Sequence, residues 1–196
     1  MAKIKKKSSP LKKKKSTVKI NKKSKMQPAR KRQKRKIPAV PKGYHSIIPY
    51  LIVQQASQAI QFYKDVFGAK EIMKMEHPSS GKITHAELKI GDAKIMLADV
   101  CPQMDARSPQ DFGGSPVGIH VYIKNVDAVV ERAVSAGAKV LRPVENMFYG
   151  DRSGALEDPY GHKWYIATHI EDVSVAKVKK RATEWYEKNQ MQKENE

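Results

Sequence analysis

Two histidines and one carboxylate occupy alternating positions in strand-like runs, where they could do chemistry. In the run 82–90, His85 and Glu87 fall on the more polar side, because side chains two apart along a strand share a face. His120 takes a similar position in the run 117–124. Two imidazoles and a carboxylate suit an open metal site or acid–base catalysis near neutral pH. They also suit residues that only orient one another in a binding cleft, or an exposed sheet face.

A second candidate is the run FYGDR at residues 148–152. Gly150 allows backbone conformations that are closed to other residues, so Asp151 and Arg152 could lock a loop. The planar fork of donors on Arg152 could also hold an anionic ligand, and the alternative is a salt bridge between strand ends.

The remaining reactive side chains favour structural roles. Cys101 is the single cysteine, which excludes an internal disulfide, and it has no histidine beside it in sequence. Residues 158–161, DPYG, fit a type I turn, and His162 beside them is interpreted as structural.

The elements that position these residues form a repeated pattern of one strand, one helix and three strands. Gly68-Ala69-Lys70 and Gly137-Ala138-Lys139, 69 residues apart, close the two helices. The first strand is predicted to be buried on both faces. The expected strands are 48–53, 70–76, 82–90, 93–99, 117–124, 139–142, 148–157 and 162–169, and the expected helices are 59–67 and 126–134.

The charge is concentrated at the N-terminus. Residues 1–42 hold 19 lysines and arginines and no carboxylate, whereas the other 154 residues hold 19 basic and 20 acidic groups. Such a segment is predicted to be disordered and to contact nucleic acid through phosphates without sequence preference, since it has no aromatic residue to stack on bases. The run 30–36, RKRQKRK, would serve as a nuclear-import signal in a cell with a nucleus. The residues expected to contact nucleic acid are Lys12, Lys13, Lys14, Lys15, Arg30, Lys31, Arg32, Lys34, Arg35 and Lys36.

No membrane partner is expected. The longest apolar run, 47–53, contains Pro49 and is far shorter than the ~20 residues that a spanning helix needs. A single cysteine favours a reducing compartment, so we expect a cytoplasmic protein.

Several phrases resemble one known family. They are IIPYLIV, AIQFYKDVFGAKEI, GKITHAELKIGDAKIMLAD, GIHVYIKNVDAV, MFYGDRSG and EDPYGHKWYIATHIED, within residues 44–175. The chain is similar to the vicinal oxygen chelate (VOC) superfamily, and most of all to its PhnB-like glyoxalase/bleomycin-resistance branch. The resemblance implies an α+β fold of tandem βαβββ modules that form a half-barrel with helices outside. The expected domains are a basic tail and linker, 1–42, a VOC domain, 43–172, with modules at 44–99 and 117–169, and a C-terminal helix, 173–196, packed on the domain.

The resemblance also implies where metal-dependent members hold their ion. The corresponding positions are Ile48, Ile95 or Met96, Gly118 and Tyr165, none of which can bind a divalent metal. No cofactor is therefore expected, and a divalent metal at a displaced site, held by His85, Glu87 and His120, is the alternative.

The cleft implied by the family fold gathers the candidate site residues. His85, Glu87 and His120 are the candidate catalytic residues, and at least one of the histidines should lie within hydrogen-bonding reach of Glu87 or a cleft tyrosine. The candidate ligand-binding residues are Tyr50, Tyr122, Tyr149, Arg152 and Tyr165.

Three functions fit these residues. The first is a metal-independent protein that binds a small organic ligand, like the resistance members of the superfamily. The second is an enzyme, a lyase, isomerase or dioxygenase that acts through the histidines. The third is a nucleic-acid-associated scaffold. We favour the first, and we expect a homodimer.

Overall fold

The computed structural model describes residues 37–193, and their side chains as far as residue 188. The ten lysines and arginines predicted to contact nucleic acid lie outside the described residues.

The first module has the predicted order of elements. It comprises β1 (Tyr50–Val53), α1 (Ala56–Phe67), β2 (Lys70–Glu76), β3 (Ile83–Ile90) and β4 (Ala93–Asp99). The apolar face of α1 is buried, and Gly68 ends the helix at a φ of 66°, donating its N–H to the Lys64 carbonyl. This is the left-handed cap that the sequence predicted.

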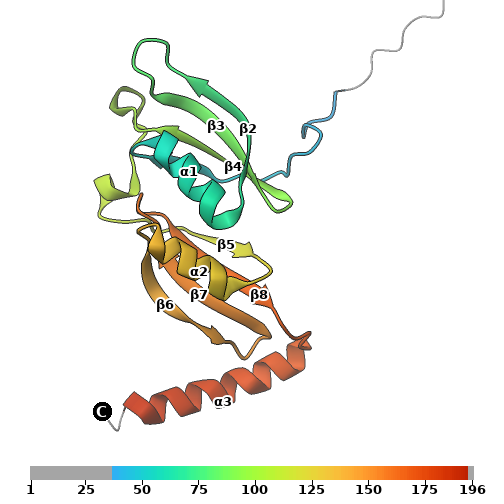
Figure 1. Ribbon diagram of the computed structural model, residues 1–196. Helices are drawn as coiled ribbons and strands as arrows, with labels where there is room; N and C mark the ends of the chain where they lie inside the picture. Colours follow the sequence, from blue (N-terminus) through green and yellow to red (C-terminus); the bar gives the residue numbers. More distant parts are fainter. Residues whose placement is uncertain (1–36, 194–196) are drawn as a thin grey trace, which may run out of the picture. The chain divides into compact units, whose positions relative to one another are not determined.

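The second module repeats the first (Figure 1). It comprises β5 (Gly118–Tyr122), α2 (Val126–Ser135), β6 (Lys139–Asn146), β7 (Asp151–Glu157) and β8 (Lys163–His169). The Asn125 side chain accepts the N–H of Ala128 at 3.2 Å and so caps the start of α2. Two short 3-10 turns, Pro102–Met104 and Pro109–Phe112, lie in the connection between the modules.

Each module builds its own four-stranded sheet. The strand orders are β1-β4-β3-β2 and β5-β8-β7-β6, and in each sheet the first strand of the module runs parallel to the last. The tandem βαβββ architecture predicted from the repeat is thus confirmed.

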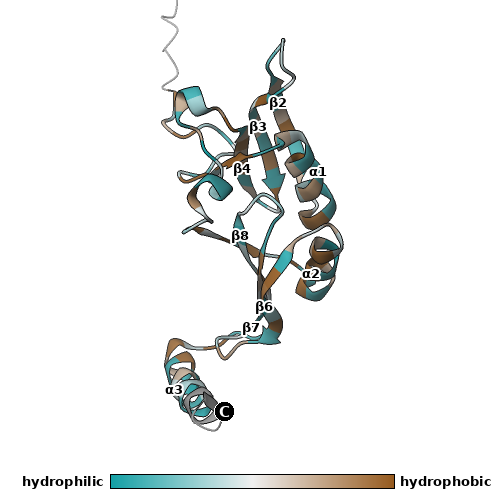
Figure 2. Ribbon diagram, turned by 90° about the vertical axis from the view of Figure 1, so that its left-hand side faces the viewer, coloured by the Kyte–Doolittle hydropathy of each residue, from teal (hydrophilic) through white to brown (hydrophobic). Residues whose placement is uncertain are grey.

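The two modules share one hydrophobic core, in which α1 and α2 pack on the same side of the molecule (Figure 2). The rings of Phe67 and Trp164 lie 4.5 Å apart between centroids. Asp158 joins the modules as well, because its Oδ2 accepts hydrogen bonds from the Tyr63 hydroxyl and the Trp164 indole, each at 2.8 Å. The turn expected at 158–161 forms, with the Gly161 N–H donating to the Asp158 carbonyl at 3.0 Å.

Three strand predictions need correction. Only one face of β1 is buried, since Leu51 is 5% exposed but Tyr50 is 48% exposed; no helix covers the second face within the described residues. The strand expected from residue 148 begins at Asp151, because a turn closed by the Gly150 N–H and the Met147 carbonyl occupies the start of that run. The strand expected at 139–142 continues to Asn146.

The C-terminal helix, α3 (Val175–Lys193), forms within the predicted range 173–196 (Figure 1). Its first residue, Val175, is 73% exposed, and the contacts with the domain come from residues further along the helix. Arg181 binds both oxygens of Glu171, at 2.8 and 3.0 Å, and the Trp185 ring lies 5.8 Å from that of Phe148. Within residues 37–193, no helix is long and apolar enough to cross a membrane.

Candidate functional site

Tyr50, His85 and Glu87 form one polar cluster on the face of the first sheet that the helices leave open. The Tyr50 hydroxyl lies 3.0 Å from His85 Nδ1, and His85 Nε2 lies 3.7 Å from Glu87 Oε1. β3 presents His85 and Glu87 together because Ala86 and Leu88, which alternate with them, are buried beneath the sheet. The prediction that a histidine would reach a cleft tyrosine is confirmed. Partial burial raises the pKa of the Tyr50 hydroxyl.

Two further residues complete this cluster, and the sequence did not single them out. The Tyr44 hydroxyl donates to Glu87 Oε2 at 2.6 Å, and Lys94 Nζ lies 3.4 Å from the same oxygen. Lys94 also lies over the Tyr44 ring, 3.3 Å from its centroid. The hydrogen bond from Tyr44, followed by those from Lys94 and His85, lowers the pKa of Glu87 although burial opposes this. Glu87 is therefore a buried carboxylate that is held ionised.

His120 does not join this cluster. It lies exposed on β5 in the second sheet, its ring 4.8 Å from that of Tyr122 and its backbone in register with Tyr165. Within residues 37–193, no three His, Cys, Asp or Glu side chains are grouped so as to hold a metal ion. The three residues of the displaced-metal alternative are thus divided between two sheets.

Gly118 is at a position where metal-dependent relatives are expected to carry a metal ligand. An aromatic ring lies where a side chain at this position would extend. A Cβ atom at Gly118 would overlap the ring of Tyr165. The Tyr165 ring therefore fills the space into which a longer side chain on β5 would extend.

A cavity of about 1060 Å³ lies between β1 and β5. Tyr50 and His120 both line it, so the two modules bring these predicted residues to one site. Among the described residues that line it there is no carboxylate, whereas Arg107 and Lys163 are present. Arg107 pairs with Asp105 at 2.8 Å, and no ion pair of Lys163 occurs within the described part of the chain. The remaining walls are mainly apolar and include Pro49, Leu51, Phe112, Pro116, Val117 and Ile119.

His162 also borders this cavity, but its environment fits the structural role expected of it. The side chain is buried, and its Nε2 lies 3.3 Å from the Ile52 carbonyl oxygen. Burial lowers its pKa, although the nearby Asp158 opposes this.

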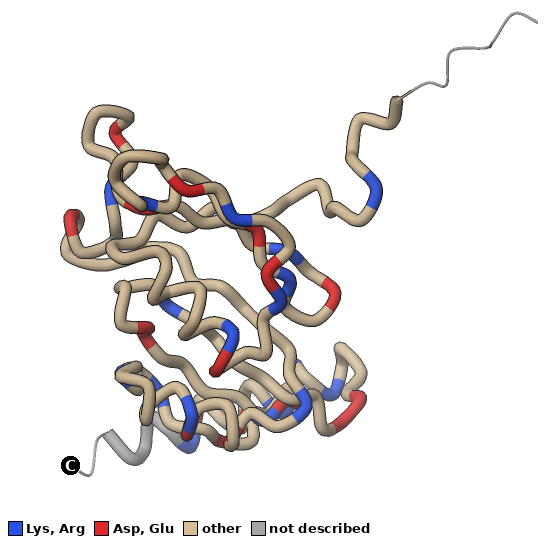
Figure 3. The backbone as a smooth tube through the Cα atoms, turned by 45° about the horizontal axis from the view of Figure 1, so that its top comes forward, with Lys and Arg blue, Asp and Glu red and all other residues tan. Residues whose placement is uncertain are grey.

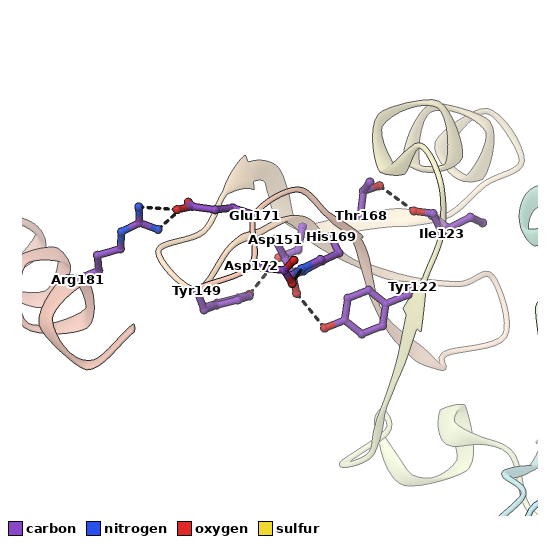
Figure 4. A network of polar contacts seen from close by, with 10 residues as sticks. Tyr122, Ile123, Tyr149, Asp151, Thr168, His169, Glu171, Asp172 and Arg181 are labelled. Carbon is purple, nitrogen blue, oxygen red and sulfur yellow. Dashed lines mark hydrogen bonds and ion pairs between the residues drawn. The ribbon is translucent and has the colours of Figure 1, made fainter. Parts of the chain in front are cut away.

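A second polar network lies at the end of the second sheet (Figure 4). Asp151, only 4% exposed, accepts the Tyr122 hydroxyl at 2.9 Å and contacts His169 Nδ1 at 2.7 Å. His169 Nε2 lies 3.1 Å from Asp172. Hydrogen bonds to Asp151 and Asp172 raise the pKa of His169, and the bond to Asp151 raises that of Tyr122. The network forms because Asp151 on β7 is in register with His169 on β8.

The other predicted ligand-binding residues have protein partners. The guanidinium of Arg152 binds both carboxylate oxygens of Asp127, at 2.6 and 2.8 Å. Asp127 lies in the first turn of α2, so this salt bridge joins a strand to a helix and not two strand ends as expected. The Tyr149 hydroxyl lies 3.2 Å from Ser153 Oγ. Tyr165 is 44% exposed and lies over Gly118. Cys101 is unpaired in the described structure, its Sγ 3.6 Å from the Gln103 side-chain oxygen.

The fold and the family comparison agree. A family model described as the Glyoxalase/Bleomycin resistance protein/Dioxygenase superfamily matches residues 44–166, which include both βαβββ modules. The chain belongs to this superfamily.

Known relatives extend this assignment. An uncharacterized protein of Mycobacterium bovis is 38% identical over 136 residues, covering 68% of this chain and 89% of that protein. An X-ray structure of an Arabidopsis thaliana gene product is 28% identical, with a TM-score of 0.52, covering 63% of this chain and 98% of that one. The PhnB protein of Bacillus cereus is 18% identical, with a TM-score of 0.51 over 63% of this chain and 99% of that one, and is similar in fold.

Proposed function

We propose that this protein binds a small organic molecule in the cavity between β1 and β5, without the usual metal site of the superfamily. The observation that carries the proposal is the cavity of about 1060 Å³, which places Tyr50 and His120 in one largely apolar wall. This combination of apolar surface and a few polar groups is typical of ligand sites.

The lining defines the kind of ligand. Apolar walls favour a ligand with a hydrophobic body, and Lys163 and Arg107 favour an anionic or strongly accepting group. Because Lys163 makes no ion pair within the described residues, it can bind such a group without first breaking one.

Binding is favoured over catalysis because the three candidate catalytic residues are not assembled. A lyase, isomerase or dioxygenase acting through His85, Glu87 and His120 needs all three around one substrate. His85 lies 3.7 Å from Glu87, whereas His120 contacts Tyr122 on the other sheet. The enzyme remains the alternative, in which a ligand bridges the two groups.

The cavity can be tested with 8-anilinonaphthalene-1-sulfonate, an apolar fluorophore that carries one negative charge. We expect saturable binding that Lys163→Gln weakens about tenfold, since a charge-assisted contact is lost. His120→Ala should also weaken binding yet leave the melting temperature nearly unchanged, because His120 is exposed. Lys70→Gln, an exposed lysine on β2 away from the cavity, is the matched control. Binding that neither Lys163→Gln nor His120→Ala changes would overturn the proposal.

We also propose that the protein is a homodimer. Large apolar side chains are exposed on the open sides of both sheets, including Tyr50, Met73, Met75, Tyr122 and Tyr165, which are 41–62% exposed. Exposure of large apolar side chains on a sheet face favours a protein interface there. Sedimentation equilibrium should give twice the mass of one chain, and Met75→Glu should shift the protein toward monomer.

A separate property is proposed for the tail, which we expect to bind nucleic acid through phosphates. The observation in favour is the segregation of charge: 19 basic and no acidic residues in 1–42. In the folded part basic and acidic residues are interspersed (Figure 3). If the tail binds nucleic acid, we expect a cytoplasmic protein that associates with nucleic acid. In a cell with a nucleus, we expect the protein to be nuclear.

Salt dependence provides the test. If roughly ten cations reach phosphates, log K for duplex DNA should fall with log salt at a slope near −9. Removing residues 1–42 should abolish the binding while far-UV circular dichroism of the domain is preserved. Equal binding with and without the tail would refute this proposal, and the scaffold alternative with it.

A further inference from the structure

Tyr44 lies in the segment that leads from the basic tail into β1, and its side chain turns inward. A turn closed by the Tyr44 N–H and the Pro41 carbonyl, at 3.1 Å, precedes it, with Gly43 at a φ of 81°. From residue 37 to residue 47, Tyr44 is half-buried and the other residues are exposed. The segment has no regular secondary structure before β1. Tyr44 is therefore the contact that fixes this part of the chain to the sheet.

The groups around the Tyr44 side chain match the two parts of a phenol, its hydroxyl and its ring. Glu87, 5% exposed, accepts the Tyr44 hydroxyl at 2.6 Å, and the Lys94 ammonium lies 3.3 Å from the centre of the ring. Lys94 Nζ also lies 3.4 Å from Glu87 Oε2, and His85 Nε2 lies 3.7 Å from Glu87 Oε1. The site thus combines a buried acceptor for a hydroxyl with a cation above an aromatic ring.

We propose that Tyr44 is an internal occupant of a phenol-binding site formed by Glu87 and Lys94, which a phenolic ligand enters when the segment 37–48 moves away. Removal of Tyr44 leaves a buried carboxylate without its shortest hydrogen bond, and a ligand phenol restores both the bond and the ring contact. Tyr44 and a free phenol compete for the same site. Because Tyr44 is part of the same chain, it competes with an effective concentration of about millimolar, the value typical of a short flexible connection.

This site is separate from the cavity between β1 and β5. Tyr44, Glu87 and Lys94 do not line that cavity. The phenol site can therefore exist whether or not the fluorophore binds as proposed above, and each test can fail without the other.

The probe is 4-methylphenol, the side chain of tyrosine as a free molecule, added to the full-length protein. Binding is followed by the ring resonances of His85, which contacts Glu87. We expect Tyr44→Ala to bind 4-methylphenol about tenfold more tightly than the wild type, because the internal competitor is absent. In the same variant 4-methylanisole, which lacks the hydroxyl proton, should bind about tenfold more weakly.

Two further variants make the result decisive. His45→Ala, at the exposed neighbouring position, should bind like the wild type. Tyr44→Phe keeps the ring and loses the hydroxyl, so it should bind with intermediate affinity and is informative if Tyr44→Ala does not fold. Equal affinity of 4-methylphenol for the wild type and both Tyr44 variants would overturn the proposal. Equal binding of 4-methylphenol and 4-methylanisole to Tyr44→Ala would also overturn it.

Discussion

Asp158 lies where the two modules meet, and its carboxylate accepts four hydrogen bonds. Oδ2 accepts the Tyr63 hydroxyl and the Trp164 indole, each at 2.8 Å, while Oδ1 accepts the backbone N–H groups of Tyr160 and His162 at 3.0 and 2.9 Å. Asp158 is 3% exposed and Tyr63 is fully buried. Water cannot replace a lost partner there without a rearrangement of the core.

The most informative change is Tyr63→Phe, which removes one donor and keeps the ring. A hydrogen bond to a charged group contributes about 1.5–3 kcal/mol, so the free energy of unfolding should fall by that amount. Asp158→Ala should cost more, at least about 3 kcal/mol, because it leaves the Trp164 and Tyr63 donors buried without an acceptor. Asp158→Asn should fall between the two.

Urea unfolding followed by far-UV circular dichroism measures these differences. With a slope of about 2 kcal/mol/M, Tyr63→Phe should lower the midpoint by about 1 M. Asp65→Ala, which breaks the exposed bond between Gln61 and Asp65 on the surface of α1, is the control and should change stability by less than about 0.5 kcal/mol. A Tyr63→Phe midpoint equal to that of the control would show that Asp158 does not join the modules energetically.

Three other perturbations have defined outcomes. The pKa of His169 is raised in the folded protein, so its charged form stabilises the fold below the unfolded pKa, near 6.5. This contribution is lost as the pH rises through the folded pKa. His169→Gln should therefore reduce the difference in melting temperature between pH 5.5 and pH 8.5. The pKa of Glu171 is lowered to about 2, chiefly by its hydrogen bonds with Arg181. The attachment of α3 should therefore hold above the unfolded pKa of about 4.5 and weaken as the pH falls toward 2. Glu171→Gln should speed hydrogen exchange in the first turns of α3 at neutral pH, and unchanged exchange would contradict this. Gly118→Ala places a methyl group against the exposed Tyr165 ring, which can turn aside, so the change should displace that ring and cost less than about 1 kcal/mol, measured by urea unfolding.

Much of the fold follows from local sequence patterns. The helix predicted over residues 59–67 forms because its apolar residues recur at helical spacing and Gly68 can take the left-handed conformation that ends it, although it begins three residues earlier, at Ala56. The strand predicted over residues 82–90 forms at 83–90 because apolar and polar residues alternate along most of it, although Glu87 on its polar side is buried as well. The repeat then fixed the order of the elements in both modules.

The sequence also determined part of the site. His85 and Glu87 are two residues apart on one strand, so their shared face is a consequence of strand geometry alone. The sequence could not show that Tyr44, 43 residues before Glu87, would donate the shortest hydrogen bond to the Glu87 carboxylate. Tyr44 lies outside any periodic run, and its position depends on how the chain turns before β1.

Only the tertiary structure decided which residues of different strands meet. Asp151 and His169 pair because β7 and β8 run antiparallel in one register, and a shift of one residue would direct one of the two side chains to the opposite face. His120 and His85 lie apart because each module closes its own sheet, whereas Tyr50 and His120 share a cavity because β1 and β5 border the same space. Periodicity assigns a side chain to a face, but the distance between two faces depends on packing between segments far apart in the chain.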